Sequence, residues 1–213
     1  MKKAIVIGST GLVGTALVSQ LLENDNYSEV ISFVRRKSDS AHPKLTEHIV
    51  DFDKPDLWKN LVKGDVLFSA MGTTIKAAKT KDNQYKVDYT YQFETAKAAC
   101  ENGVPVYVLV SSAGASSSSL NFYTNMKGKL EDSVKLLPFK TIQILQPGQL
   151  DGNRKEHRTG EKMAPKMMHF FNKMGFLMKY RPIQGSEVAR FMIMIAEKPV
   201  SGVYKLDELF KIK

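Results

Sequence analysis

A tyrosine and a lysine four residues apart give the strongest chemical signal in this sequence. Tyr123 and Lys127 stand in the run Tyr-Thr-Asn-Met-Lys, and a spacing of i and i+4 places both side chains on one face of a helix. An ammonium group beside a phenol favours the phenolate and lowers the pKa of the phenol from about 10. Such a phenol can donate or accept a proton near neutral pH. The pair therefore indicates proton transfer, whereas an exposed helical pair of this kind elsewhere would be structural.

A serine upstream of this pair can bind a substrate carbonyl oxygen. Ser112 lies in Val-Ser-Ser-Ala-Gly at the end of a valine-rich run, eleven residues before Tyr123. Ligands of open α/β sheets bind beyond the carboxyl ends of the strands. We therefore expect the Ser112 hydroxyl to hydrogen-bond a carbonyl oxygen beside Tyr123, with Ser111 as the less favoured candidate.

Three glycines follow the first apolar run with the spacing Gly-x-x-Gly-x-x-Gly. Gly8 would allow a tight turn after a strand, Gly11 would let the backbone approach a pyrophosphate, and Gly14 would let a helix pack closely on the sheet. Free N–H groups at the start of that helix would bind the phosphates. The predicted dinucleotide-binding loop comprises Gly8, Thr10, Gly11, Leu12, Val13 and Gly14.

Two arginines at the end of the second predicted strand bear on the choice of cofactor. Arg35 and Arg36 stand there, and the first acidic residue after them is Asp39. An NAD site would place Asp or Glu at this point to bind the ribose 2′-hydroxyl, whereas arginines suit a 2′-phosphate. The sequence therefore favours NADP(H) over NAD(H), with a solvated basic strand end as the alternative. Asp51 and Phe52, after the third predicted strand, could flank the adenine ring.

Alternating strands and helices must position these residues. Apolar runs predict strands at 3–7, 29–34, 48–51, 65–70, 104–110, 140–145 and 203–206, and helical patterns cover 11–24, 82–102, 121–137 and 186–197. This alternation indicates βαβ units. We expect an α/β protein with a doubly wound parallel sheet of the Rossmann type. A single domain would span residues 1–213, with 151–181 and 199–213 as a substrate-side extension.

Composition excludes several classes of protein. The chain has 213 residues, 43% of them hydrophobic and 25% charged, which suits one soluble globular domain and argues against intrinsic disorder. One cysteine excludes an internal disulfide, and the four histidines lack paired metal-ligand spacing, so no metal site is expected. The first apolar run ends at Gly8, too early for a secretory signal core, and no run is long enough to span a membrane. These features predict a cytoplasmic protein, either a monomer or a homodimer.

The net charge of +9 is concentrated near the C-terminal end. Residues 154–181 hold eight Lys or Arg and two Glu, and five of the ten methionines lie there. The charge suits an anionic ligand or a lipid surface at least as well as DNA, and because the sequence has no nucleic-acid-binding motif, no nucleic acid is expected. The segment could be an amphipathic helix packed on the sheet, a pliable cover over an apolar substrate, or a membrane-surface helix. We expect residues 160–180 to line the substrate pocket.

These motifs occur in the order typical of the short-chain dehydrogenase/reductases, which the chain resembles over essentially its whole length. The resemblance rests on the glycine loop, Ala70-Met71-Gly72, Ser112, Tyr123-x-x-x-Lys127 and Pro147-Gly148. It implies that Tyr123 is the proton donor and acceptor, that Lys127 binds the nicotinamide ribose and tunes the tyrosine, and that Ser112 orients the carbonyl. It also implies cofactor contacts from Ala70, Met71, Gly72, Pro147 and Gly148.

The chain is similar, more narrowly, to the atypical branch that contains the Tat-interacting oxidoreductase-like proteins. Met71-Gly72-Thr73-Thr74, Lys86-Val87-Asp88-Tyr89 and Asn121-Phe122-Tyr123 through Lys127-Gly128 carry that likeness. Asp88 stands where many relatives have Asn, and Gln146 stands where relatives often have Arg. The resemblance predicts an NADP(H)-dependent oxidoreductase acting on a small carbonyl or alcohol. An NADP(H)-binding regulatory protein, or an epimerase that retains its cofactor, is the alternative.

Overall fold

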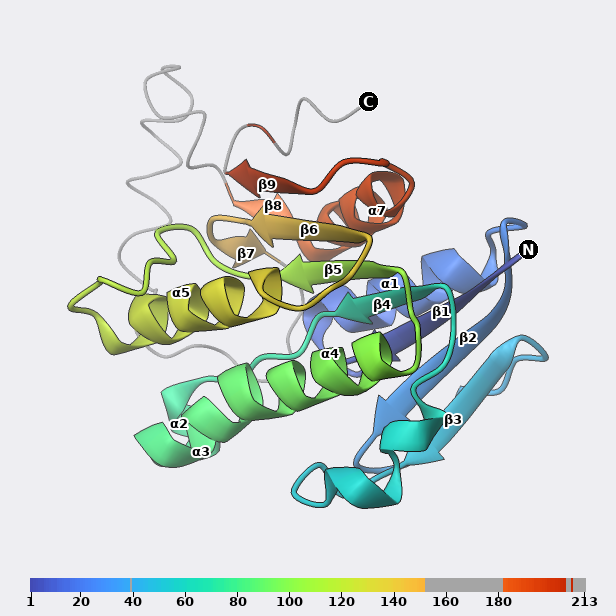
Figure 1. Ribbon diagram of the computed structural model, residues 1–213, viewed down its shortest axis with the longest axis horizontal. Coiled ribbons are helices and arrows are strands. Elements are labelled where there is room, and N and C mark those ends of the chain that lie inside the picture. Colours follow the sequence, from blue (N-terminus) through green and yellow to red (C-terminus); the bar gives the residue numbers. More distant parts are fainter. Residues whose placement is uncertain (39, 152–181, 206–207, 209–213) are drawn as a thin grey trace.

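A seven-stranded parallel sheet forms the centre of the computed structural model, which describes residues 1–38, 40–151, 182–205 and 208 (Figure 1). The strand order is β3-β2-β1-β4-β5-β6-β9, and each neighbouring pair is parallel. The strands are β1 (Lys2–Ile7), β2 (Tyr27–Val34), β3 (Leu45–Ile49), β4 (Val66–Ser69), β5 (Val106–Val110), β6 (Thr141–Gln146) and β9 (Gly202–Lys205). Two short strands, β7 (Leu150–Asp151) and β8 (Ile183–Gln184), form a second parallel pair. The predicted α/β class is therefore confirmed.

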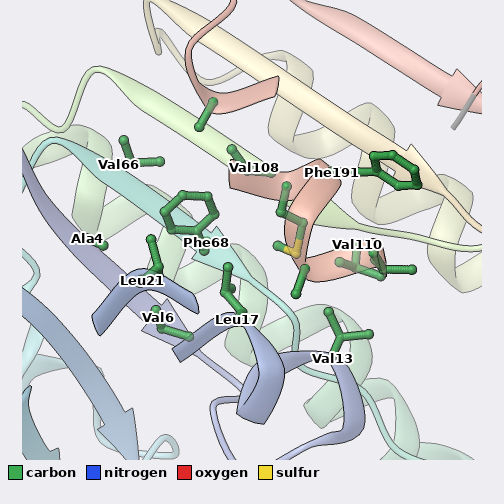
Figure 2. Close-up of a cluster of buried hydrophobic side chains, with 14 of the residues drawn as sticks. Ala4, Val6, Val13, Leu17, Leu21, Val66, Phe68, Val108, Val110 and Phe191 are labelled. Atoms are coloured by element: carbon green, nitrogen blue, oxygen red, sulfur yellow. The ribbon is translucent and has the colours of Figure 1, made fainter. Parts of the chain in front are cut away.

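Helices cover both faces of the sheet because successive residues of each strand point to opposite sides. In β1, Ala4 and Val6 belong to one buried cluster, and Ile5 and Ile7 belong to the other. The first cluster lies under α1 (Leu12–Leu22) and α7 (Gly185–Ala196) and includes Phe68 and Phe191 (Figure 2). The second lies under α4 (Tyr91–Glu101) and α5 (Phe122–Lys135).

The strand order reverses between β1 and β4, and this is the point at which open α/β sheets generally bind their ligands. From β1 the chain builds outward through β2 and β3, and then returns to β4, β5 and β6 on the other side of β1. The crossover connections diverge at this point, so a crevice forms beyond the carboxyl ends of β1 and β4. The glycine loop follows β1 and the Ala70-Met71-Gly72 segment follows β4, so both reach this crevice.

The long helix predicted over 82–102 contains an irregularity that local periodicity does not reveal. It consists of α3 (Lys81–Tyr85), a π-helical turn η3 (Lys86–Thr90) and α4. Isolated π-turns insert an extra residue into a helix and frequently occur at functional sites. A further short helix, α2 (Ile75–Ala78), and two 3-10 turns, η1 (Pro55–Leu57) and η2 (Lys59–Leu61), were not predicted.

Candidate functional site

A cleft of about 790 Å³ opens beyond the carboxyl ends of β1 to β4. Its lining includes most of the residues predicted to bind a cofactor, namely Gly8, Thr10, Gly11, Arg35, Asp51, Phe52, Ala70, Met71 and Gly72. Leu12, Val13, Gly14, Arg36, Lys127, Pro147 and Gly148 are not in the lining. Four segments that are far apart in the sequence therefore meet in one cleft. Residues from the stretch between α2 and η3 form a further wall of this cleft.

The glycine loop has the geometry that a phosphate-binding turn requires. Gly8 has φ of +79°, and a Cβ atom there would lie 2.5 Å from the Met71 nitrogen. A Cβ atom on Gly14 would lie 2.0 Å from the Gly8 carbonyl oxygen, so only glycine lets α1 approach the loop so closely. Helix α1 begins after Gly11, which caps it without a side chain, and its first turn contains no acidic residue. Its first N–H groups are therefore available to an anion.

Charged side chains of both signs line the cleft. Arg35 is exposed, and its side chain has no hydrogen bond or ion pair to another residue in the described part of the chain. Asp53 and Lys86 form an ion pair of 3.0 Å, and the hydrogen bond from Lys86 holds the pKa of the Asp53 carboxyl below its ordinary value. Asp53 therefore stays ionised at neutral pH and compensates Lys86, whereas the charge of Arg35 remains available to a ligand.

Phe52 belongs mainly to the core beside the cleft. Its ring packs at 5.5 Å against Trp58 and at 5.4 Å against Tyr91, and only 5% of the residue is exposed. Phe52 therefore forms part of the cleft floor. Asp51, beside it, is half-exposed and accepts a hydrogen bond from the Asp53 amide.

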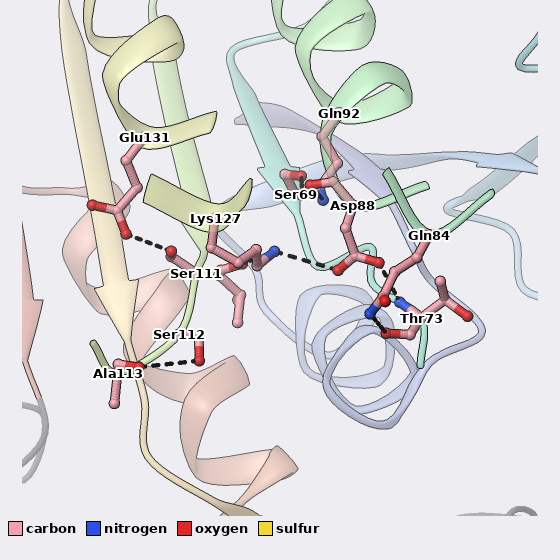
Figure 3. A network of polar contacts seen from close by, with 11 residues as sticks. Ser69, Thr73, Gln84, Asp88, Gln92, Ser111, Ser112, Ala113, Lys127 and Glu131 are labelled. Atoms are coloured by element: carbon pink, nitrogen blue, oxygen red, sulfur yellow. Dashed lines mark hydrogen bonds and ion pairs between the residues drawn. The ribbon is translucent and has the colours of Figure 1, made fainter. Parts of the chain in front are cut away.

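Lys127 is buried and paired with an acidic residue. Its Nζ atom lies 3.8 Å from Oδ1 of Asp88 and donates to the Val110 carbonyl oxygen at 3.4 Å (Figure 3). Asp88 lies within the π-turn η3 and is 1% exposed. Its Oδ2 atom accepts a hydrogen bond of 2.8 Å from the backbone N–H of Thr73, which lines the cleft. A chain of polar contacts therefore joins the cleft to Lys127.

Tyr123 stands in the first turn of α5, four residues before Lys127 on the same helix. The Asn121 side chain caps this helix by accepting hydrogen bonds from the N–H groups of Tyr123 at 2.9 Å and Thr124 at 3.2 Å. Tyr123 is partly buried, and it lies outside the residues that line the cleft.

The serine-rich loop that connects Ser112 to Tyr123 is fastened to α5. The Ser116 N–H donates to the Thr124 carbonyl at 3.0 Å, and the Asn125 amide donates to the Ser117 carbonyl at 2.6 Å. A Cβ atom on Gly128 would lie 2.1 Å from the Ser116 carbonyl carbon. Close packing at Gly128 therefore fixes the path of the chain between the serine and the tyrosine.

The two candidate serines have different surroundings. Ser111 is buried and its hydroxyl donates to the Glu131 carboxylate, which also accepts two hydrogen bonds of 2.9 Å from the Gln146 amide. Ser112 is partly exposed, and within the described part of the chain its hydroxyl makes one hydrogen bond, a long one of 3.4 Å to the Ala113 carbonyl. Ser112 is therefore the serine whose hydroxyl can turn toward a ligand.

Pro147 follows β6 and lies beside the end of β5, because its carbonyl oxygen accepts a 2.8 Å hydrogen bond from the Ala113 N–H. The ends of β5 and β6 therefore meet next to Ser112, and Gly148 follows Pro147 directly in the connection to β7. The basic, methionine-rich segment predicted to line the substrate pocket, at 160–180, lies outside the described residues. Most of the predicted extension at 151–181 does so as well.

Several cleft residues were not predicted from the sequence, above all Thr73, Lys79 and Lys86. In the sequence, Thr73 directly follows Gly72 and Lys86 lies two residues before Asp88. This adjacency is only a weak indication that the two residues line the cleft. Among the described residues no cluster of His, Cys, Asp or Glu could hold a metal ion. Within the same part of the chain, no helix has the length and apolar character needed to cross a membrane.

Comparison with known families matches residues 8–199 to the family described as NAD(P)H-binding. Proteins named "Protein FMP52, mitochondrial" are similar over most of the chain. The protein from Candida albicans is 34% identical over 94% of this chain and 90% of its own length. The protein from Debaryomyces hansenii is 35% identical over 98% of both chains.

Solved structures share the fold at low sequence identity. WbmH of Bordetella bronchiseptica, determined in complex with NAD⁺, has a TM-score of 0.71 and 15% identity, over 96% of this chain and 75% of its own. UDP-N-acetylglucosamine 4-epimerase from Bacillus cereus has a TM-score of 0.69 and 20% identity, over 96% of this chain and 78% of its own. These likenesses support the Rossmann-type fold.

The expectation of a cytoplasmic protein is wrong, because the FMP52 relatives are named as mitochondrial proteins. The early end of the first apolar run is evidence about secretory signal peptides and gives no information about import into an organelle. An organelle address is read by receptors and is not fixed by composition or hydropathy, so these two properties do not indicate the compartment.

Proposed function

The chain belongs to the NAD(P)H-binding family, and on that premise we propose that it is an NADP(H)-dependent oxidoreductase. It reduces a carbonyl or oxidises an alcohol with Ser112, Tyr123 and Lys127. The observation that carries this proposal is the polar connection from the cleft through Thr73 and Asp88 to the buried Lys127. A protein that only bound a dinucleotide would need no buried ammonium group on the helix that also carries Tyr123.

The cleft suits a dinucleotide on physical grounds. The close approach at Gly8 and Gly14 leaves a backbone cradle that a Cβ atom would fill, next to the uncapped start of α1. That arrangement favours a diphosphate. Arg35 adds an uncompensated cation at the end of β2, which favours a 2′-phosphate and hence NADP(H).

The chemistry assigned to this chain's own residues is proton transfer and orientation. A bound nicotinamide supplies or accepts the hydride. The Ser112 hydroxyl donates a hydrogen bond to the substrate oxygen, and the Tyr123 phenol gives a proton to that oxygen as negative charge develops on it. Lys127 contributes a fixed positive charge one helical turn away. In the oxidative direction the same groups remove the alcohol proton.

The likeness in Met71-Gly72-Thr73-Thr74 and around Tyr123 supports placement in the atypical branch of the short-chain dehydrogenase/reductases. The mitochondrial names of the relatives support a mitochondrial location.

Two measurements test this function. Calorimetric titration with NADPH and NADH tests dinucleotide binding, and a panel of carbonyl compounds followed by NADPH absorbance tests turnover. We expect binding of NADPH and consumption that Tyr123→Phe abolishes. Binding without consumption on any carbonyl would contradict the enzyme and favour the regulatory alternative. Absence of binding would contradict both.

A further inference from the structure

Lys79 occupies an unusual backbone position on the wall of the cleft. Its φ and ψ are 69° and −34°, and it is the only non-glycine residue with positive φ in the described part of the chain. L-residues rarely adopt this region, because their Cβ atom crowds the backbone. Strained residues of this kind persist where the surrounding structure fixes them, and they cluster at ligand-binding sites.

Local hydrogen bonds fix this turn on both sides of Lys79. The Lys79 N–H donates to the Ile75 carbonyl at 2.8 Å and ends α2. The Asn83 side chain donates to the Ala78 carbonyl at 3.0 Å, while Thr80 caps α3 by accepting from the Asn83 N–H at 3.1 Å. A glycine would meet the needs of this turn without strain. The turn itself therefore does not account for the lysine side chain.

No acidic residue compensates the charge of Lys79 in the described part of the chain. Among the described residues, three basic side chains line the cleft, namely Arg35, Lys79 and Lys86. Lys86 is paired with Asp53, whereas the side chain of Lys79 has no ion pair or hydrogen bond among the described residues. Arg35 follows β2 and Lys79 follows α2, so the two available cations reach the cleft from different elements.

We propose that Lys79 is a cofactor-binding residue that contacts a phosphate group of the dinucleotide. This inference rests on the proposed function. NADP(H) carries two anionic centres, the 2′-phosphate and the diphosphate, and the cleft offers two uncompensated cations from separate walls. The lysine on the α2–α3 turn adds a side-chain contact to the backbone cradle at Gly8 and Gly11, and the strained turn holds its Cα at the cleft wall.

Replacement of Lys79 separates its charge from its backbone strain. Lys79→Gln removes the charge and retains a long side chain, Lys79→Gly removes the charge and the strain, and Lys79→Arg retains the charge. Lys76→Gln is the matched control, because Lys76 is an exposed lysine of α2 that does not line the cleft. Each variant is titrated with NADPH and with NADH by calorimetry at low and moderate salt.

We expect Lys79→Gln and Lys79→Gly to weaken binding by about fivefold to tenfold, with a shallower salt dependence than the wild type. Lys79→Arg and Lys76→Gln should stay within about twofold of wild-type affinity. Lys79→Gly should also raise the melting temperature by about 2–4 °C, since it removes the strain. If Lys79→Gly is more stable than the wild type and yet binds the cofactor more weakly, misfolding cannot explain the loss of affinity.

The two cofactors identify the phosphate. Equal losses for NADPH and NADH assign Lys79 to the diphosphate, whereas a loss for NADPH alone assigns it to the 2′-phosphate. Wild-type affinity for both cofactors in Lys79→Gln and Lys79→Gly would overturn the inference while leaving the proposed function intact. Failure of the wild-type protein to bind either cofactor would instead refute the proposed function.

Discussion

The ammonium group of Lys127 lies 3.8 Å from the Asp88 carboxylate, and each side chain is at most 3% exposed. The π-turn η3 therefore supplies the buried counter-charge of the lysine, namely the Asp88 carboxylate. The other oxygen of the same carboxylate is bound by the Thr73 N–H at the edge of the cleft. The position of Lys127 consequently depends on the loop that follows β4, and a change at the cleft can reach the lysine through one side chain.

Removing either member of this buried pair should be costly. Asp88→Asn or Lys127→Met leaves an uncompensated buried charge, and each should lower the free energy of unfolding by about 3–5 kcal/mol. The double variant should lose less than the sum of the two, by about 1–3 kcal/mol. Urea denaturation measures the free energy of unfolding of the two single variants and of the double variant. Lys97→Met, which breaks an exposed 4.0 Å pair with Glu101, is the control and should change stability by at most about 0.5 kcal/mol. Strict additivity of the two buried changes would contradict direct pairing.

Loss of the Tyr123 hydroxyl should stop the reaction without unfolding the protein. Tyr123→Phe keeps the ring, so cofactor affinity should remain close to wild type, while turnover should fall by about a hundredfold or more. Tyr85→Phe is a matched change in a partly buried tyrosine that stacks on Tyr89. Initial rates and NADPH titration give the two readouts. If Tyr123→Phe keeps most of the wild-type rate, another group supplies the proton.

The adjacent serines should separate stability from activity. Ser111→Ala removes a donor to the buried Glu131 carboxylate and should cost about 1–3 kcal/mol of unfolding free energy, with turnover by the folded protein preserved. Ser112→Ala should leave stability within about 0.5 kcal/mol and lower turnover. Urea denaturation and initial rates, measured on the same preparations, show which serine contributes to stability and which to turnover. The reverse pattern would assign the substrate contact to Ser111.

Close packing at Gly14 should be needed for cofactor binding. In Gly14→Ala the new methyl group would lie 2.0 Å from the Gly8 carbonyl oxygen, so α1 must move away from the loop. We expect a loss of about 1–3 kcal/mol in stability and at least a tenfold loss of NADPH affinity. Gly103→Ala is the control, because its Cβ atom would meet nothing within 4 Å and only the positive φ of +79° is disturbed. It should cost about 1 kcal/mol and leave affinity unchanged.

Arg35 should carry the preference for NADPH over NADH. A charge-assisted contact with the 2′-phosphate is worth about 1.5–3 kcal/mol, so the wild type should favour NADPH by tenfold or more. Arg35→Ala should abolish that preference while leaving NADH affinity nearly unchanged. Arg36→Ala, next to it but outside the cleft lining, should have the smaller effect. Equal affinity of the wild-type protein for both cofactors would disprove the 2′-phosphate assignment.

The layers of the fold and the order of the glycine, serine and tyrosine–lysine motifs along the chain could be predicted from local sequence patterns. Strand and helix periods follow from local backbone geometry, so the alternation of residues in β1 between two cores was readable in advance. The conformation of the glycine loop could be predicted from the glycine spacing for the same reason. Its turn, its helix cap and its close helix contact all depend on residues within a few positions of Gly8 and Gly14. The residues grouped at the carboxyl ends of β1 to β4 follow from the parallel topology.

The different surroundings of neighbouring residues could not be predicted, because they depend on contacts between segments that are far apart in the sequence. Ser111 and Ser112 are adjacent and chemically identical, and the contact with Glu131, twenty positions away, distinguishes them. Asp88 reaches Lys127 because a π-turn interrupts a helix whose apolar pattern looks continuous. Lys79 gives no sequence signal, because a lysine with positive φ is set by hydrogen bonds on both sides of its turn. Such long-range contacts depend on packing, and no local pattern records them.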